Sequence, residues 1–177
     1  MGTGMKLLTY FTKRLTTITL VIIILFMATF IAYDCANIYV ILEEGMDLRA
    51  ETVLTGEEAP LLDKFFTQSF ISSDKLLNSD MYEDFIISEY DYKIKVKKVW
   101  AWPWSRRAKA TIQEIVFDIS GEFSPQDDVE DADDEEETPS VPIPEWENGE
   151  KIVELRKMNH RWIIDKVTME RPLEKFD

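Results

Sequence analysis

The sequence has one cysteine and one histidine, and this scarcity removes several classes of chemistry. Cys35 has no partner within the chain, so an internal disulfide is excluded; a free thiol or an intermolecular disulfide remains. His160 has no Ser or Cys at a spacing that indicates a nucleophilic site. Carboxylate pairs such as Glu83 and Asp84 do not differ from surface acids. We therefore predict no enzymatic activity, no catalytic residue and no cofactor.

Residues 15–33 lack any charged side chain and are rich in Ile, Leu, Val and Phe. A helix of about 20 such residues crosses a bilayer core roughly 30 Å thick. A cleaved signal peptide is the main alternative, since it also combines a basic start with an apolar core. Its apolar region is normally about 7–15 residues long and ends at a small-residue cleavage site. We therefore predict an uncleaved transmembrane helix over residues 15–36.

The charges on the two sides of this helix have opposite signs. Residues 1–14 carry three basic side chains and no acid, whereas residues 34–58 carry seven acids against Arg49 alone. Short segments rich in Lys and Arg stay cytoplasmic. The sequence therefore predicts a single-pass protein of the cell membrane, with residues 1–14 as a cytoplasmic tail and the rest of the chain extracytoplasmic.

The formal net charge of −14 is concentrated in one segment. Nine acids fall within residues 127–137, which leaves −5 for the rest of the chain. Nucleic-acid binding is disfavoured, because phosphate contacts need clustered cations. A calcium-binding EF-hand loop needs alternating ligands around a central Gly, and this run has no Gly. We expect no metal site, and we interpret residues 124–148 as a solvated, acidic, Pro-containing insertion.

Helical periodicity follows the apolar run. Apolar residues at helical spacing, with acids between them, predict an amphipathic stalk over residues 37–56 that ends at Thr55-Gly56. A first domain helix over residues 57–71 carries a broad apolar stripe. Capping side chains at residues 72–74 predict a second helix from about residue 75.

From residue 90 the apolar period changes to two, which is typical of strands with one solvated face. The first of four predicted strands begins near residue 90, and the other three cover residues 108–123, 151–158 and 161–169. A turn at Asn159-His160 joins the last two. Within the second strand the inward phase shifts near Gln113-Glu114, which predicts a β-bulge there. Helices followed by strands favour an α+β fold with the helices on one face of a mostly antiparallel sheet.

The ending KIVELRKMNHRWIIDKV, residues 151–167, resembles the final hairpin of nuclear transport factor 2-like domains. In that family the hairpin closes a cone-shaped sheet around the helices. The resemblance implies that residues 57–177 form a cone-like domain of two or three helices packed on a curved, mostly antiparallel four-stranded sheet. A single span followed by such a domain is similar to the assembly-factor components of conjugative and type IV secretion channels, which are oligomerising scaffolds without enzymatic activity.

Between residues 92 and 113 the chain carries seven basic side chains, three tryptophans and no acid. Three interpretations remain open. The segment is a solvated strand face with a Trp-rich connection over the core, a protein contact surface in which Trp and Arg act as hot spots, or an attachment to anionic lipid headgroups. The candidate partner-binding residues are Lys93, Lys95, Lys97, Trp100, Trp102, Trp104, Arg106 and Arg107.

Together these features predict a membrane-anchored scaffold or assembly component of a multiprotein envelope complex, such as a conjugation or secretion channel. The expected partners are the lipid bilayer through residues 15–36, other envelope or channel proteins and a second copy of the chain, with no nucleic acid. Two alternatives use the cavity of the cone. One is an accessory module that binds a small apolar ligand, and the other, less supported, is an enzyme.

Overall fold

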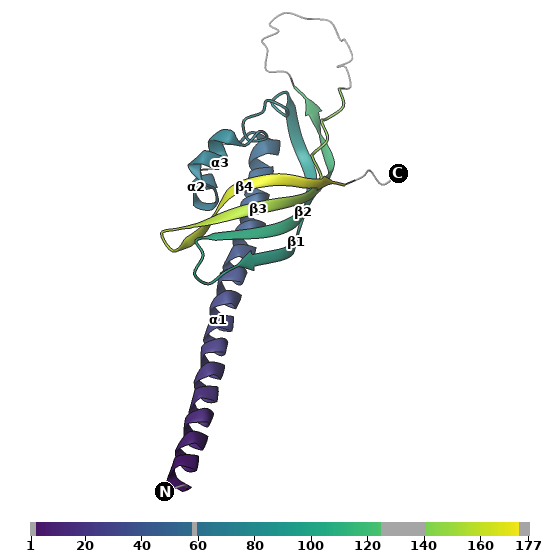
Figure 1. Cartoon of the computed structure of the whole chain (residues 1–177). Coiled ribbons are helices and arrows are strands. Elements are labelled where there is room, and N and C mark those ends of the chain that lie inside the picture. Colours follow the sequence, from purple (N-terminus) through teal and green to yellow (C-terminus); the bar gives the residue numbers. More distant parts are fainter. Residues whose placement is uncertain (1–2, 58–59, 125–140, 174–177) are drawn as a thin grey trace, which may run out of the picture.

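The computed structural model describes residues 3–57, 60–124 and 141–173. The elements are α1 (Thr3–Thr55), α2 (Leu62–Phe65), α3 (Gln68–Ser73), β1 (Phe85–Ala101), β2 (Arg107–Phe123), β3 (Gly149–Met158) and β4 (Arg161–Pro172). The strands form one antiparallel sheet in the order β1-β2-β3-β4. In Figure 1 the helices lie on one side of the sheet, and α1 continues far beyond it. The predicted α+β class, with helices followed by a four-stranded antiparallel sheet, is confirmed.

The N-terminal half of α1 projects from the domain as an exposed apolar helix. α1 has 53 residues, which corresponds to a length of about 80 Å. It is long and apolar enough to cross a membrane, as a single anchor or as part of a signal sequence. Four threonine hydroxyls in the apolar run are satisfied without water, because each donates to a main-chain carbonyl one turn earlier at 2.9–3.0 Å: Thr16, Thr17, Thr19 and Thr29.

The C-terminal part of α1 is the core helix of the domain. Ile38, Leu42 and Met46 follow each other at intervals of four residues, so they share one face of the helix. They have no exposed surface and belong to the main core cluster together with side chains of β2 and β3. The amphipathic pattern over residues 37–56, from which we expected a stalk, thus belongs to a helix with one face on the sheet. The helix ends before Gly56, whose φ of 67° suits a glycine.

Between α1 and β1 the chain forms shorter helices than expected. The helix predicted over residues 57–71 is divided into α2 and α3 by Thr67, which has extended backbone. Thr67 is held there because its N–H donates to the Ile164 carbonyl at 2.9 Å and its hydroxyl accepts from the Phe70 N–H. The helix predicted from residue 75 is absent, since residues 75–78 form turns.

The bulge predicted at Gln113-Glu114 lies elsewhere. In β2 the inward phase runs without a break through Ile112, Glu114 and Val116, which are all buried. The irregularity occurs at Asp118, where φ is 54° and the pairing with β1 skips a position. The prediction was wrong because the polarity of Glu114 indicated an outward position, whereas this glutamate points into the domain.

The turn at Asn159-His160 is confirmed, and its φ values of 48° and 65° are typical of a type I′ hairpin turn. Part of the expected solvated insertion is packed on the domain. Trp146 is only 5% exposed, and the side chain of Asn148 bonds both the N–H and the carbonyl of Val116. The nine acids of residues 127–137 lie outside the described residues.

Leu42→Ala tests whether the C-terminal part of α1 is core. We expect the free energy of unfolding to fall by about 2–5 kcal/mol, because the truncation leaves a cavity. Urea unfolding of the full chain in detergent micelles, followed by tryptophan fluorescence, measures this change. Val40→Ala is the control, since Val40 is 48% exposed on the same helix and its truncation should change stability by at most about 0.5 kcal/mol. Equally small effects of both substitutions would show that this segment is a free stalk.

Candidate functional site

The eight predicted binding residues fall into two groups in the structure. Lys93, Lys95 and Lys97 are exposed on β1, where they alternate with partly buried residues that pack against the core. These lysines therefore lie on the sheet face turned away from α1, which we call the outer face. The other five residues lie in or beside the connection between β1 and β2. We call residues 100–107 the tryptophan turn.

Acids from β3 balance part of the positive charge on the outer face. The ammonium of Lys97 lies 3.4 Å from a carboxylate oxygen of Glu150. The ammonium of Lys109 lies 3.7 Å from a carboxylate oxygen of Glu154. Both acids come from a strand far along the sequence, so the acid-free run of residues 92–113 did not reveal them. The outer face is therefore mixed in charge.

The tryptophan turn exposes its three large rings to solvent. Trp100, Trp102 and Trp104 are 63%, 48% and 68% exposed, although Ala101 between them is buried. The ring centres of successive tryptophans are 6.4 and 5.6 Å apart, so the rings form one continuous aromatic surface. These side chains do not cover the core, so the Trp-rich connection is not the core cover that the first interpretation expected, although the exposed lysines of β1 do form a solvated strand face.

The turn between β3 and β4 lies beside the tryptophan turn at the same end of the sheet (Figure 1). The two turns are joined by a hydrogen bond from the Lys157 N–H to the Arg106 carbonyl, 2.8 Å long. They enclose a groove of about 700 Å³, which we call the basic groove; none of the described residues that line it is acidic. Its lining residues are Arg106, Arg107, Arg156, Lys157, Met158, Asn159 and His160.

Two of the four cations in the basic groove have an acidic partner. Arg156 pairs with Asp165 at 2.8 Å, and Lys157 pairs with Asp34 at 2.9 Å. Arg106 and Arg107 are exposed, and no acid of residues 3–57, 60–124 or 141–173 forms an ion pair with either of them. Their guanidinium groups are therefore available to an anion from outside this part of the chain.

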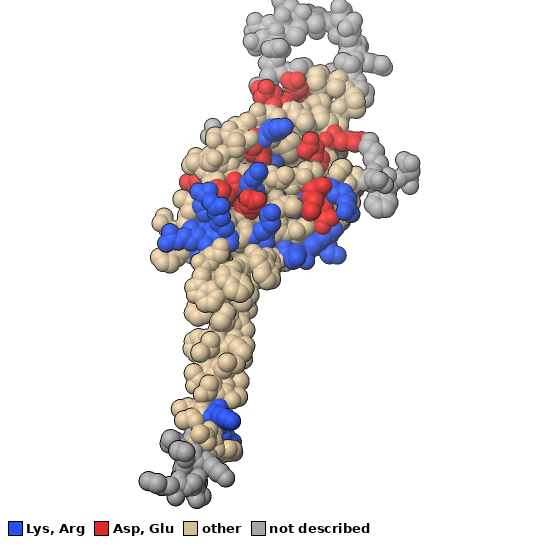
Figure 2. All heavy atoms as spheres, viewed as in Figure 1, with Lys and Arg blue, Asp and Glu red and all other residues tan. Residues whose placement is uncertain are grey.

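Asp34 fixes this end of the sheet to α1. It is the first charged residue after the apolar run, yet it is only 8% exposed. Its carboxylate accepts hydrogen bonds from the Trp162 indole at 3.1 Å and the Lys157 ammonium at 2.9 Å. Because of these contacts, the basic groove begins where the apolar half of α1 ends. Figure 2 shows Lys and Arg side chains along this border of the domain, with most acids farther from the bare helix.

Two ion pairs form a cluster of charged residues inside the domain, apart from the basic groove. Both carboxylate oxygens of Asp74 accept from the Arg49 guanidinium at 3.0 Å, and Lys151 pairs with Glu114. Two cations and two anions balance the charge of this buried cluster, as burial requires. Burial, and secondarily the charge of Glu114, raises the pKa of Tyr92, whose hydroxyl donates to Glu114 at 3.3 Å.

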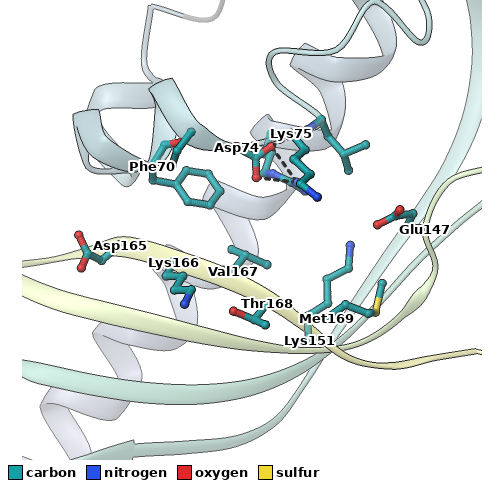
Figure 3. A pocket seen from close by; sticks show the side chains of 13 residues that line it. Phe70, Asp74, Lys75, Glu147, Lys151, Asp165, Lys166, Val167, Thr168 and Met169 are labelled. Carbon is teal, nitrogen blue, oxygen red and sulfur yellow. Dashed lines mark hydrogen bonds and ion pairs between the residues drawn. The ribbon is translucent and has the colours of Figure 1, made fainter.

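A pocket of about 430 Å³ opens beside the buried cluster. Figure 3 shows that charged side chains from several elements surround it, among them Asp74, Glu147 and Lys151. The Nε and Nη1 atoms of Arg49 find no acceptor within the described part of the protein, and the guanidinium lies 5.9 Å from the rings of both Phe70 and Trp146. Such a charged lining suits water and polar groups better than an apolar ligand.

Within the described ranges, no three His, Cys, Asp or Glu side chains cluster so that they could hold a metal ion. His160 is exposed in its turn. Comparisons of the chain with protein-family models, with curated proteins and with solved structures found no match.

The buried cluster yields a prediction about stability. Lys151→Met should lower the free energy of unfolding by about 3–5 kcal/mol, because it leaves the buried Glu114 carboxylate without its nearest cation. The double variant Glu114→Leu/Lys151→Met removes both charges and should be more stable than Lys151→Met alone. Urea unfolding of the wild type, the double variant and both single variants, Lys151→Met and Glu114→Leu, at neutral pH completes the double-mutant cycle. Additive losses would contradict the pairing.

Alkaline pH provides a test of the burial of Tyr82, which packs in a smaller core cluster with Val116 and Trp146. Burial raises the pKa of Tyr82 to about 12, above the value of about 10 for an unfolded chain. The folded state thus holds this proton more tightly, so stability should fall as the pH rises from about 10 to about 12. Tyr82→Phe should reduce the loss of unfolding free energy over this interval, whereas Tyr39→Phe, at a 46% exposed tyrosine, should not. An unchanged profile for Tyr82→Phe would contradict the assignment.

Proposed function

We propose that this chain is a single-pass membrane protein with a cytoplasmic N-terminus, and that its extracytoplasmic domain is a scaffold in a multiprotein envelope complex such as a conjugation or secretion channel. The exposed apolar half of α1 supports the anchor, as do the threonine hydroxyls that need no water. The basic residues before this helix and the acids after it support the orientation.

The observation that carries this proposal is the continuity of α1 from its apolar half into the domain core. A domain on a flexible linker samples many orientations relative to the membrane. Here the same helix continues into the core through Ile38, Leu42 and Met46. The domain therefore keeps one orientation relative to the anchor, which suits a component that must present one surface to its neighbours.

The outer face is the surface that we propose for protein partners. No described helix covers it (Figure 1). It combines the lysines of β1 with partly exposed apolar residues of the neighbouring strand, for example Lys93 opposite Ile115. Protein interfaces typically combine such apolar and polar contacts. β1 and β4 are also the two edges of the sheet. Phe66 forms a bridge to Ile164 on the β4 edge, so β1 is the edge where a strand from another protein or a second copy can pair.

A nuclear transport factor 2-like architecture is part of the proposal. Helices gathered on one face of a four-stranded antiparallel sheet, closed by a final hairpin that buries Trp162, are compatible with it. The main core helix is then the continuation of the membrane anchor. We assign no catalytic role to this domain.

Site-directed photo-crosslinking in intact membranes tests the scaffold role. A photoreactive residue in place of Lys95, on the outer face, should give adducts with envelope proteins or with a second copy. The same residue in place of Glu44, which is exposed on α1, serves as the matched control and should give few adducts. Recovery of uncrosslinked monomer alone from the Lys95 position would count against the proposal.

A further inference from the structure

The tryptophan turn and the basic groove lie at a defined level along α1. From Arg14 to Asp34 the helix rises about 30 Å, which matches the hydrocarbon core of a bilayer. Asp34 then lies at the outer edge of this core, and its hydrogen bond to Lys157 holds the groove at the same level.

Partial burial on α1 extends below Asp34 on the face that the domain covers. Between residues 9 and 33 only Met27 and Ile31 are partly buried, and they precede Cys35, which packs against the core, at intervals of four residues. The domain thus reaches down to the end of the apolar run, so no free helix separates it from the bilayer of the proposed anchor.

The chemistry of this end of the domain matches that of a lipid headgroup layer. Tryptophan combines a large apolar ring with one N–H donor, and it is enriched where membranes meet water. Arginine binds phosphate through a planar pair of donors. The tryptophan turn supplies three exposed rings, and Arg106 and Arg107 supply the cations without a described acidic partner. Met158, 45% exposed at the tip of the other hairpin, adds an apolar contact.

We infer that the tryptophan turn and the basic groove dock on the anionic surface of the bilayer that holds α1, with the indoles at the acyl boundary and the two arginines on lipid phosphates. This docking rests on the proposed membrane anchor but not on the scaffold role. A protein partner is the other class of ligand that Trp and Arg suit. Position favours lipid, because a protein would have to fit between the domain and the membrane surface.

The first part of the test measures the depth of the indoles. The full chain is reconstituted in phosphatidylcholine vesicles with or without phosphatidylglycerol, using lipids brominated near the top of their acyl chains as quenchers. Tryptophan emission should fall by about twofold, because three of five indoles lie at that depth. The variant with Trp100, Trp102 and Trp104 replaced by Phe should lose most of this quenching, since Trp146 and Trp162 are buried.

The second part measures the preference for anionic lipid. Spin-labelled phosphatidylglycerol and phosphatidylcholine report their relative association with the reconstituted chain. Arg106→Gln/Arg107→Gln should lower the preference for phosphatidylglycerol by roughly tenfold. Lys93→Gln/Lys95→Gln removes the same charge at least about 16 Å farther along β1 and should leave most of the preference intact.

Three results would overturn this inference: equal quenching of the wild type and the Phe variant, equal lipid preference in the two Gln variants, or a photoreactive residue at Trp102 that captures protein rather than lipid in intact membranes. Its failure is distinguishable from failure of the proposed function. An absent protein partner at Lys95 leaves the lipid results unchanged, whereas an absent anchor leaves the chain unable to float with vesicles in any variant.

Discussion

One unbroken helix forms both the apolar N-terminal projection and the central core element of the domain, and the rest of the structure depends on this continuity. Ile38 and Leu42 pack against the sheet directly after the apolar run, so no linker separates the apolar run from the domain. Asp34 then binds Trp162 and Lys157 of the final hairpin and fixes one end of the sheet against the helix. A buried carboxylate is costly without such partners, so Asp34 keeps its contact with the hairpin. This contact fixes the position along α1 of the tryptophan turn and of the turn between β3 and β4.

Local sequence patterns predicted the strands well and the helices less well. Alternation of side chains identified all four strands, and Asn159-His160 identified the tight turn, because these features depend on near neighbours. The amphipathic pattern of residues 37–56 is the same for a stalk as for a helix against a sheet. Only the position of the strands in space distinguishes the two. The division of the next helix at Thr67 likewise depends on a carbonyl from β4, nearly a hundred residues later.

The candidate site was predictable in composition but not in arrangement. The basic and aromatic segment was recognisable because Trp and Arg together are typical of contact surfaces. Its division into an outer face with acids nearby and a turn beside the apolar helix arises from β3, β4 and Asp34, which are remote in sequence. The burial of Arg49 and Glu114 was also missed. Inward-facing positions are recognised by apolar side chains, and a buried charged residue interrupts that pattern. An isolated acid directly after a long apolar run was the one available signal for Asp34.

If the domain rests on the bilayer as proposed, the position along α1 at which lipid gives way to water lies at the lower end of the domain. Single spin labels placed along the exposed side of α1 in a Cys35→Ser background, from Phe26 through Tyr33 to Val40 and Glu43, report contact with lipid or water through oxygen and a water-soluble relaxation agent. We expect the change from lipid to water to fall between Tyr33 and Val40, next to Asp34. A change two or more turns before Asp34 would place bare helix in water below the domain and contradict a domain seated on the membrane.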